Sequence, residues 1–376
     1  MDKARASIFP PPLAPPRAGG GELEHHLPQR GEVGTRSVPG GGRLAIFVAG
    51  ACLLLSTAAH AATPADFYKG RTLNVIIGYS PGGGYDLYAR VLAQHIGKHI
   101  PGNPTVIPQN MPGAGSLKAA NYLFSVAAKD GLTIGTFSRS MATAPLMGHA
   151  SFDASKFSWL GSITKDTTLC VSWKASPIAS WNDVMAKEFT VGGDGADADP
   201  DIFAKLYKNV FGAKIRLATG FPGTSDIALA MQRGEVQGLC GISWSTIKSE
   251  HAAWLKEGRI NVLIQAAQAK DPELPNVPLA TDFAKTDEQR EILAFAIAGQ
   301  AMARPFLAPP GIPADRLAAL RAAFAETLTD PAFVADAKRL QLDINPVTGE
   351  EIGKLVAAVY ATPKDVVAKA TRAMTN

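Results

Sequence analysis

A short strand-like segment, a glycine-rich turn and a helix-like segment follow one another twice, and this repeated order constrains the fold more than any other feature of the sequence. Residues 72–79, TLNVIIGY, form an apolar run with β-branched residues that ends in SPGGG. Leu87, Val91 and Ile96 then recur at helical spacing until the Pro-Gly pair at 101–102 ends the helix. Strands that alternate with helices in this way predict βαβ units with a parallel sheet.

A second unit repeats the pattern. Residues 105–108 are strand-like, PGAGS at 112–116 is a turn, residues 117–127 carry a helical apolar stripe, and residues 132–137 are again strand-like. Ligands of such sheets bind at the carboxyl ends of the strands. Both glycine-rich turns lie at that edge.

The middle of the chain predicts a second α/β lobe, and the end of the chain predicts helices. Thr348 and Glu351 have capping-box spacing at the start of the last of these helices. The segments concerned are strands at 168–173, 189–192, 214–218 and 236–239 with helices between them, a Pro-rich segment at 272–278, an apolar stretch at 292–303, and helices at 314–328, 331–340 and 348–360.

The amino-terminal part is predicted to be a leader and not part of the fold. Its one sustained apolar run, 44–57, is about 14 residues long, whereas a membrane-spanning helix needs roughly 20. Arg43 precedes the run and Ala-His-Ala follows it at 59–61, which predicts a signal peptide cleaved before Ala62 and therefore a periplasmic protein. An uncleaved anchor is the alternative. Residues 1–61 are accordingly assigned to a low-complexity leader and signal peptide.

Composition and charge exclude several classes of protein. Apolar residues make up 46% of the 376 residues and charged residues 19%, with a net charge of +4, so a disordered or nucleic-acid-binding chain is not expected. Cys170 and Cys240 would meet an oxidising compartment after export. They form either a disulfide or two buried thiols.

The glycine-rich turns are candidate anion sites. A turn between a strand and a helix presents backbone N–H groups and the positive end of the helix dipole, which attract a carboxylate or a phosphate. PGGG at 81–84 fits neither the dinucleotide-binding nor the P-loop pattern, so a carboxylate is favoured over a nucleotide. Asp86 is placed to accept N–H groups of the helix's first turn, and Gly113 belongs to the second turn. The alternative is that these glycines only make tight turns.

Other polar residues could complete an acid-binding cleft. Arg139, flanked by Ser138 and Ser140, follows the strand that ends at Phe137, and a guanidinium can hold a carboxylate through two hydrogen bonds. An ordinary surface arginine is the alternative. Loops of the second lobe are predicted to close over the ligand with backbone and hydroxyl donors, and their candidate residues are Asp194, Gly195 and Thr224.

Catalytic and metal-binding patterns are weak. His95 and His99 stand at i and i+4 on one helix, but no third ligand has suitable spacing, so no metal is expected. No G-x-S-x-G nucleophile elbow occurs. The sequence therefore predicts a binding protein without a cofactor, not an enzyme.

Two segments resemble a known family. FYKGRTLNVIIGYSPGGGYDLYARVLAQHI and NMPGAGSLKAANYLFSVAAKDGLTIGTFSRS resemble the tripartite tricarboxylate transporter substrate-binding family, also called the Bordetella uptake gene receptors. A Pro-Gly-Gly loop with a nearby Asp, a Pro-Gly-Ala-Gly loop and a Lys-Asp-Gly turn occur in the family's order and spacing. The resemblance covers about residues 66–360.

The resemblance implies a type II periplasmic binding protein (Venus-flytrap) architecture of two Rossmann-like α/β lobes. It implies that residues 62–167 and 292–376 form lobe 1 and residues 168–291 form lobe 2. It also implies a monomeric receptor with integral membrane subunits as partners. The first glycine-rich loop of such receptors anchors one carboxylate, which carries over to Ser80, Pro81, Gly82, Gly83, Gly84, Tyr85 and Asp86.

Three functions are open at this stage. The leading hypothesis is an extracytoplasmic receptor that captures a dicarboxylate, a tricarboxylate or an aromatic acid and delivers it to a membrane transporter. A secreted hydrolase or isomerase that acts on a small acid is the second. A sensor subunit that signals instead of transporting is the third.

Overall fold

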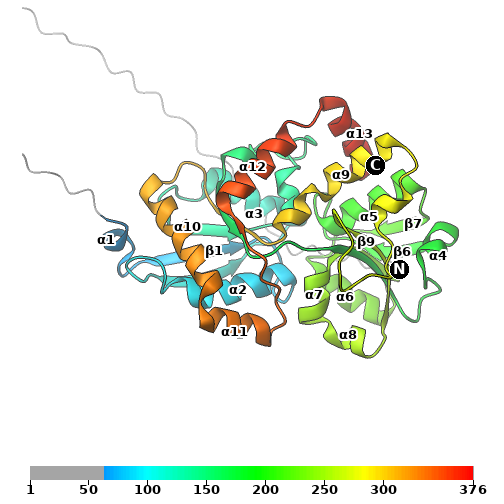
Figure 1. The fold of residues 1–376 in the computed structure, drawn as a ribbon, viewed down its shortest axis with the longest axis horizontal. Helices are drawn as coiled ribbons and strands as arrows, with labels where there is room; N and C mark the ends of the chain where they lie inside the picture. The colour runs from blue at the N-terminus through cyan, green and yellow to red at the C-terminus, as the bar shows by residue number, and fades with distance from the viewer. Residues whose placement is uncertain (1–62, 376) are drawn as a thin grey trace, which may run out of the picture. The chain divides into compact units, whose positions relative to one another are not determined.

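The computed structural model describes residues 63–375, and these residues build two mixed β-sheets with helices packed on both (Figure 1). The predicted leader and the cleavage before Ala62 lie outside the described residues. The first sheet has the order β11-β4-β10-β3-β1-β2, with strands β1 (Thr72–Ile77), β2 (Thr105–Asn110), β3 (Thr133–Thr136), β4 (Ser158–Ser162), β10 (Pro305–Ala308) and β11 (Val347–Thr348).

The parallel arrangement predicted for the first sheet holds for only part of it. β1 pairs in parallel with both β2 and β3, as the βαβ pattern predicted. β10, however, runs antiparallel between β3 and β4, and β11 runs antiparallel to β4. These strands come from the end of the chain and are not joined to β3 by a single crossover helix, so the rule that links βαβ units to parallel pairing does not apply to them.

Helices cover the first sheet and enclose two apolar clusters. α2 (Gly84–Ile96) packs on β2 and is in turn contacted by α10 (Ala314–Thr329) and α11 (Pro331–Arg339), while α12 (Gly349–Tyr360) packs on β4. These last three helices were predicted within a residue or two, and the predicted Thr348–Glu351 capping box is present. The stripe at 117–127 is instead divided between α3 (Leu117–Asn121) and a π-helical turn at Tyr122–Val126. A short α1 (Pro64–Tyr68) precedes β1.

The second sheet has the order β7-β6-β8-β5-β9. β6 pairs in parallel with β7 and β8, and β5 pairs antiparallel with β8 and β9. Its elements are β5 (Thr168–Trp173), α4 (Trp181–Ala186), β6 (Phe189–Gly192), α5 (Asp199–Phe211), β7 (Ile215–Ala218), α6 (Thr224–Arg233), β8 (Gly238–Ser243), α7 (Trp244–Glu250), α8 (Ala252–Lys256), β9 (Ile260–Ala266) and α9 (Asp287–Ile297).

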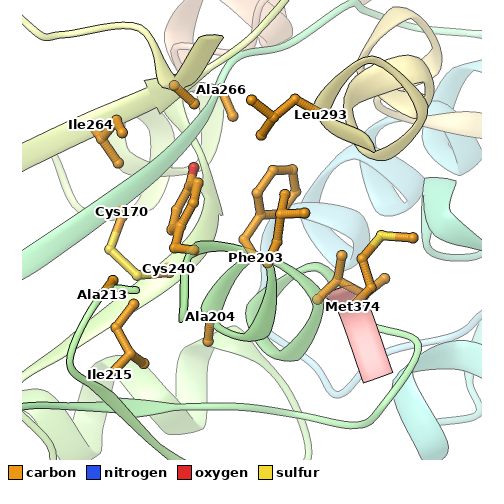
Figure 2. Close-up of a cluster of buried hydrophobic side chains, with 14 of the residues drawn as sticks. Cys170, Phe203, Ala204, Ala213, Ile215, Cys240, Ile264, Ala266, Leu293 and Met374 are labelled. Atoms are coloured by element: carbon orange, nitrogen blue, oxygen red, sulfur yellow. A yellow bond between two sulfur atoms is a disulfide. The ribbon is translucent and has the colours of Figure 1, made fainter. Parts of the chain in front are cut away.

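A disulfide joins two strands of the second sheet. Cys170 of β5 and Cys240 of β8 face each other in the antiparallel register and are bonded, so the sequence alternative of two free thiols does not hold. Figure 2 shows the bridge beside apolar side chains of the same cluster, among them Ile264 and Phe203. Both cysteines are fully buried.

The last helix of the chain contacts the second sheet's helices. α13 (Lys364–Thr375) packs against α5 and α9, and Met374 lies in the apolar cluster that also contains Phe203 and Leu293 (Figure 2). The preceding strands β10 and β11 belong to the first sheet. The division of the chain into lobes at residues 167 and 291 stays a prediction.

None of the helices between residues 63 and 375 is long and apolar enough to cross a membrane.

Candidate ligand-binding site

The first glycine-rich loop is held in shape by one buried carboxylate. Asp86, in the first turn of α2, accepts hydrogen bonds from the Gly82 N–H at 2.9 Å and from Arg90 Nε at 2.8 Å, and its other oxygen accepts from Asn110 Nδ2 at 2.7 Å. Burial by itself raises the pKa of Asp86, but these hydrogen bonds outweigh it and lower the pKa below its ordinary value. The N–H group that Asp86 accepts belongs to Gly82 of the loop and not to the first turn of α2, as the sequence had predicted, so Asp86 holds the loop in shape.

A small cavity lies where this loop meets residues of the second sheet and its helices. Its volume is about 30 Å³, which is room for only one or two water molecules. The residues that line it are Tyr79, Ser80, Gly83, Gly84, Tyr85, Arg139, Asp199, Pro200, Gly223, Thr224, Gly241, Ile242, Ser243, Thr246 and Arg304.

Arg139 reaches from the first sheet's side of the cavity to the second. It follows β3, is 2% exposed, and donates from Nε to Asp199 Oδ2 at 2.7 Å and from Nη2 to Thr168 Oγ1 at 2.5 Å. Burial alone would lower the pKa of Arg139, but the neighbouring Asp199 carboxylate raises it above its ordinary value. The guanidinium is therefore a charged link between the two sides and not a surface arginine.

Arg304 is a second buried guanidinium at the cavity, and sequence reasoning missed it. It directly precedes β10, is 1% exposed, and donates to Ser243, Ser245 and Thr246. Its charge lies over the Tyr85 ring at 4.8 Å from the centroid. The only sign of Arg304 in the sequence is a single arginine in an otherwise apolar stretch. Its hydrogen-bond partners lie about 60 residues earlier in the chain, so no local pattern links it to them.

The predicted site residues divide into two groups. Ser80, Gly83, Gly84, Tyr85, Arg139 and Thr224 line the cavity. The cavity lining does not include Pro81, Gly82, Asp86, Gly113, Ser138, Ser140, Asp194 and Gly195.

We call the seam between the first sheet's side and the second sheet's side, in which the cavity lies, the cleft. Two residues of the second group, Gly195 and Ser140, make contacts across it. Gly195 lies against Ala114 and Gly115 of the second glycine-rich loop. Ser140 donates to the Asp197 carbonyl, and the carboxylate of Asp197 contacts the His149 ring. These contacts hold the two sides of the cleft together beside the cavity.

Asp194 is buried without a donor. It is 5% exposed, and neither of its carboxylate oxygens has a hydrogen-bond partner within residues 63–375. Burial, followed by the nearby carboxylates of Asp201 and Asp199, raises its pKa well above the ordinary value. The surroundings of Asp194 therefore disfavour its ionised form.

The two histidines considered as a metal pair have other partners. His95 Nε2 lies 2.9 Å from Asp336 Oδ2, and His99 Nε2 lies 2.7 Å from Asp330 Oδ2. Asp330 precedes α11 and Asp336 belongs to it. His95 lies on α2, but α2 ends at Ile96, so His99 is not on the same helix as the spacing predicted. The two contacts hold α11 against the C-terminal end of α2 and the turn that follows it. In the part of the chain that the structure describes, no group of three or more His, Cys, Asp or Glu side chains could hold a metal ion.

Comparisons with known proteins show one family match, one related protein and several structures of the same fold. The sequence model described as "Tripartite tricarboxylate transporter family receptor" matches residues 88–372. A Cupriavidus necator protein, "UPF0065 protein in gbd 5'region", is 22% identical over 338 residues, which cover 86% of this chain and 96% of that protein.

Solved structures show the same fold. The periplasmic binding protein BugD has a TM-score of 0.66 at 18% identity, covering 81% of this chain and 98% of that one. MatC from Rhodopseudomonas palustris with bound malate has a TM-score of 0.63 at 21% identity, covering 79% and 99%. A further R. palustris protein, with adipate, has a TM-score of 0.62 at 17% identity, covering 80% and 97%.

Proposed function

Because this chain belongs to the tripartite tricarboxylate transporter receptor family, whose members are binding proteins and not enzymes, we propose that it captures a small organic carboxylate in the periplasm and delivers it to the membrane subunits of a transporter. The observation that carries the proposal is the convergence of a helix N-terminus and two buried guanidinium groups on one cavity. The bound acid is a dicarboxylate, a tricarboxylate or an aromatic acid.

The first glycine-rich loop supplies the anion site. Gly83 is the N-cap of α2, a helix of 13 residues, and no side chain caps that end. The first N–H groups of such a helix have no partner inside the helix, and its dipole favours negative charge there by about 0.3–1 kcal/mol. A ligand carboxylate is the natural acceptor, and Ser80 to Tyr85 are its proposed contacts.

Arg139 and the second lobe complete the proposed site. Arg139 offers a charged donor, and Thr224, Asp194 and Gly195 belong to the loops that close over the ligand. Malate in MatC and adipate in the other R. palustris structure support a carboxylate as the ligand class. Ser138 and Ser140 hold the Arg139 segment, since their hydroxyls contact each other at 2.6 Å.

Capture requires the two sides of the cleft to move apart. A cavity of about 30 Å³ cannot hold an organic acid, so the structure corresponds to a closed cleft. Opening and closing around a ligand is a hinge motion of the kind that two-lobed binding proteins use.

A thermal-shift screen tests the proposal. The protein, expressed with its own leader and recovered from the periplasm, is heated with malate, adipate, citrate, benzoate, sugars or nucleotides. A ligand present at 100 times its Kd stabilises by about 2.7 kcal/mol, so the correct acid raises the Tm in a dose-dependent way. The amino-terminal sequence of the recovered protein checks cleavage before Ala62.

Matched variants make the screen specific. Arg304→Gln removes a cavity guanidinium, whereas Arg216→Gln removes a guanidinium from a side chain that is 73% exposed. We expect the carboxylate-induced shift to be lost in the first variant and kept in the second. A shift with sugars or nucleotides alone, or chemical conversion of the acid, would overturn the proposal.

A further inference from the structure

Glu250 is a buried carboxyl group that the proposed carboxylate site does not use. It is the last residue of α7, and both of its carboxylate oxygens are buried without a hydrogen-bond partner in residues 63–375. Leaving an ionised group in that state is costly, because desolvation removes its hydration and nothing replaces it. The usual result is that the group binds a proton instead.

The burial of Glu250 depends on the closed cleft. α7 belongs to the second sheet's side and packs against α2 of the first sheet's side. Thr246, one turn before Glu250 on α7, accepts a hydrogen bond from Arg304 at 2.9 Å. A Cβ on Gly84 of α2 would overlap the same Thr246 hydroxyl. When α7 and α2 separate, water reaches the face of α7 that carries both residues.

The charges that face Glu250 come from the first sheet's side. Asp86 of α2 repels its negative form, and Arg304 before β10 attracts it. On either side of Glu250 in sequence, Lys248 pairs with Glu273 and Asp343 instead, and His251 stacks on the Trp254 ring. Glu250 also stands at the C-terminal end of α7, where the helix dipole disfavours a negative charge.

Burial, opposed by Arg304 and reinforced by Asp86, raises the pKa of Glu250 to about 8. In an open cleft the hydrated side chain returns to its ordinary pKa of about 4.3. At Glu250, the closed form therefore binds more protons than the open form across the whole interval between these values. By linkage, closing is favoured as the pH falls through that interval and is disfavoured as the pH rises.

We propose that closing of the cleft binds one proton at Glu250, so that the receptor takes up its acid ligand together with a proton. The part that concerns ligand affinity rests on the proposed function, whereas the part that concerns closing does not. Arg304 connects ligand binding with the protonation of Glu250, because it lines the ligand cavity and also faces Glu250.

The first test needs no ligand. The radius of gyration of the protein is measured by solution X-ray scattering from pH 5 to pH 9, for the wild type, for Glu250→Gln and for Glu188→Gln, whose side chain is 71% exposed in the wild type. We expect the wild type and Glu188→Gln to expand as the pH rises towards 9, and Glu250→Gln to stay compact throughout. An identical pH response in all three proteins would overturn the proposal.

The second test measures the proton directly, with malate as the probe. Calorimetric titration at pH 6.5 in buffers of different ionisation enthalpy gives the number of protons taken up for each malate bound. We expect the wild-type Kd to rise by up to tenfold per pH unit over the pH range in which the ligand-free protein has opened, as one-proton linkage requires, and a much flatter profile in Glu250→Gln. His149, which contacts Asp197 across the cleft, is present in both proteins, so the difference between them isolates Glu250.

The two tests separate the two hypotheses. If neither malate nor any other acid binds at any pH, the proposed ligand class fails, and the scattering experiment still decides whether Glu250 controls closing. If malate binds with the same pH profile in the wild type and in Glu250→Gln, the receptor function stands and the proton coupling is wrong.

Discussion

The two glycine-rich loops of the first sheet look alike in sequence, but the structure gives them different tasks. The first loop, residues 80–84, leads into the 13-residue α2 and lines the cavity. The second, residues 112–116, leads into a 3₁₀ turn and the five-residue α3 and does not line it. Glycine permits both an exposed helix N-terminus and a close approach between backbones.

The second loop is shaped by what lies opposite it. Ala114, Gly115 and Ser116 have φ values of 47°, 59° and 80°, so the backbone is left-handed over three residues. A Cβ on Gly115 would lie 2.7 Å from the backbone nitrogen of Ala198. Ser116 accepts the Ser138 N–H at 3.2 Å and donates to the Gly78 carbonyl. This loop is a contact between the two sides of the cleft.

Gly115→Ala tests that difference most severely. We expect the free energy of unfolding to fall by about 2–4 kcal/mol, because a left-handed alanine costs about 1–2 kcal/mol and overlap with the Ala198 backbone adds to it. Gly212→Ala is the matched control, since Gly212 has φ 72° and open space around its Cβ position. Urea denaturation of both variants gives the comparison. Equal losses of unfolding free energy in the two variants would show that a Cβ at position 115 does not overlap the Ala198 backbone.

Gly84→Ala is expected to act on binding and not on folding. Gly84 does not have a left-handed φ, but its Cβ would overlap Thr246 Oγ1 and lie 2.9 Å from Arg304 Nη2. We expect ligand affinity to fall at least tenfold with a change of less than about 1 kcal/mol in unfolding free energy, since these side chains can shift and the cleft can open. Adding Thr246→Ala should restore part of the affinity. A variant that binds as tightly as the wild type would contradict the closed geometry.

Asp86→Asn separates bracing of the first loop from ligand contact. We expect a loss of about 1–3 kcal/mol in unfolding free energy at pH 7, because the carboxylate accepts from Arg90, Asn110 and a loop N–H. The pKa of Asp86 is lowered in the folded protein, so its contribution is present above the unfolded pKa and is lost as the pH falls through the folded value.

Urea titrations at pH 7 and at pH 3 check this sign. The difference between Asp86→Asn and the wild type should shrink at the lower pH. Asp287→Asn, at a side chain that is 94% exposed, should change stability by less than about 0.5 kcal/mol at either pH. A constant difference at both pH values would show that the charge of Asp86 is not what braces the loop.

The contrast between the loops also shows what the sequence can predict. Apolar runs and turn residues locate β1, α2 and the C-terminal helices, because their signals are local. The sequence also predicts that both loops lie at one edge of the sheet, because turns that follow parallel strands meet at the carboxyl ends of those strands. The sequence does not show that Arg139 pairs with Asp199, or that Arg304 reaches the cavity, because those partners lie about 60 residues away and meet only when the two sheets come together. The antiparallel pairing of β10 with β3 and β4 likewise depends on contacts between distant parts of the chain.

Ser80→Ala is the mildest test of the first loop. Ser80 Oγ donates to Asp226 Oδ2 at 3.1 Å, and this hydrogen bond crosses from the first loop to α6. One hydrogen bond contributes about 0.5–1.5 kcal/mol, so we expect ligand affinity to fall about 2–10-fold without a change in folding of either side. A double-mutant cycle with Asp226→Ala isolates the pair, since the two single effects should not add if the residues act together only in the closed cleft. If the effects add fully, Ser80 acts on the ligand alone, and the first loop then binds the acid without helping to hold the cleft closed.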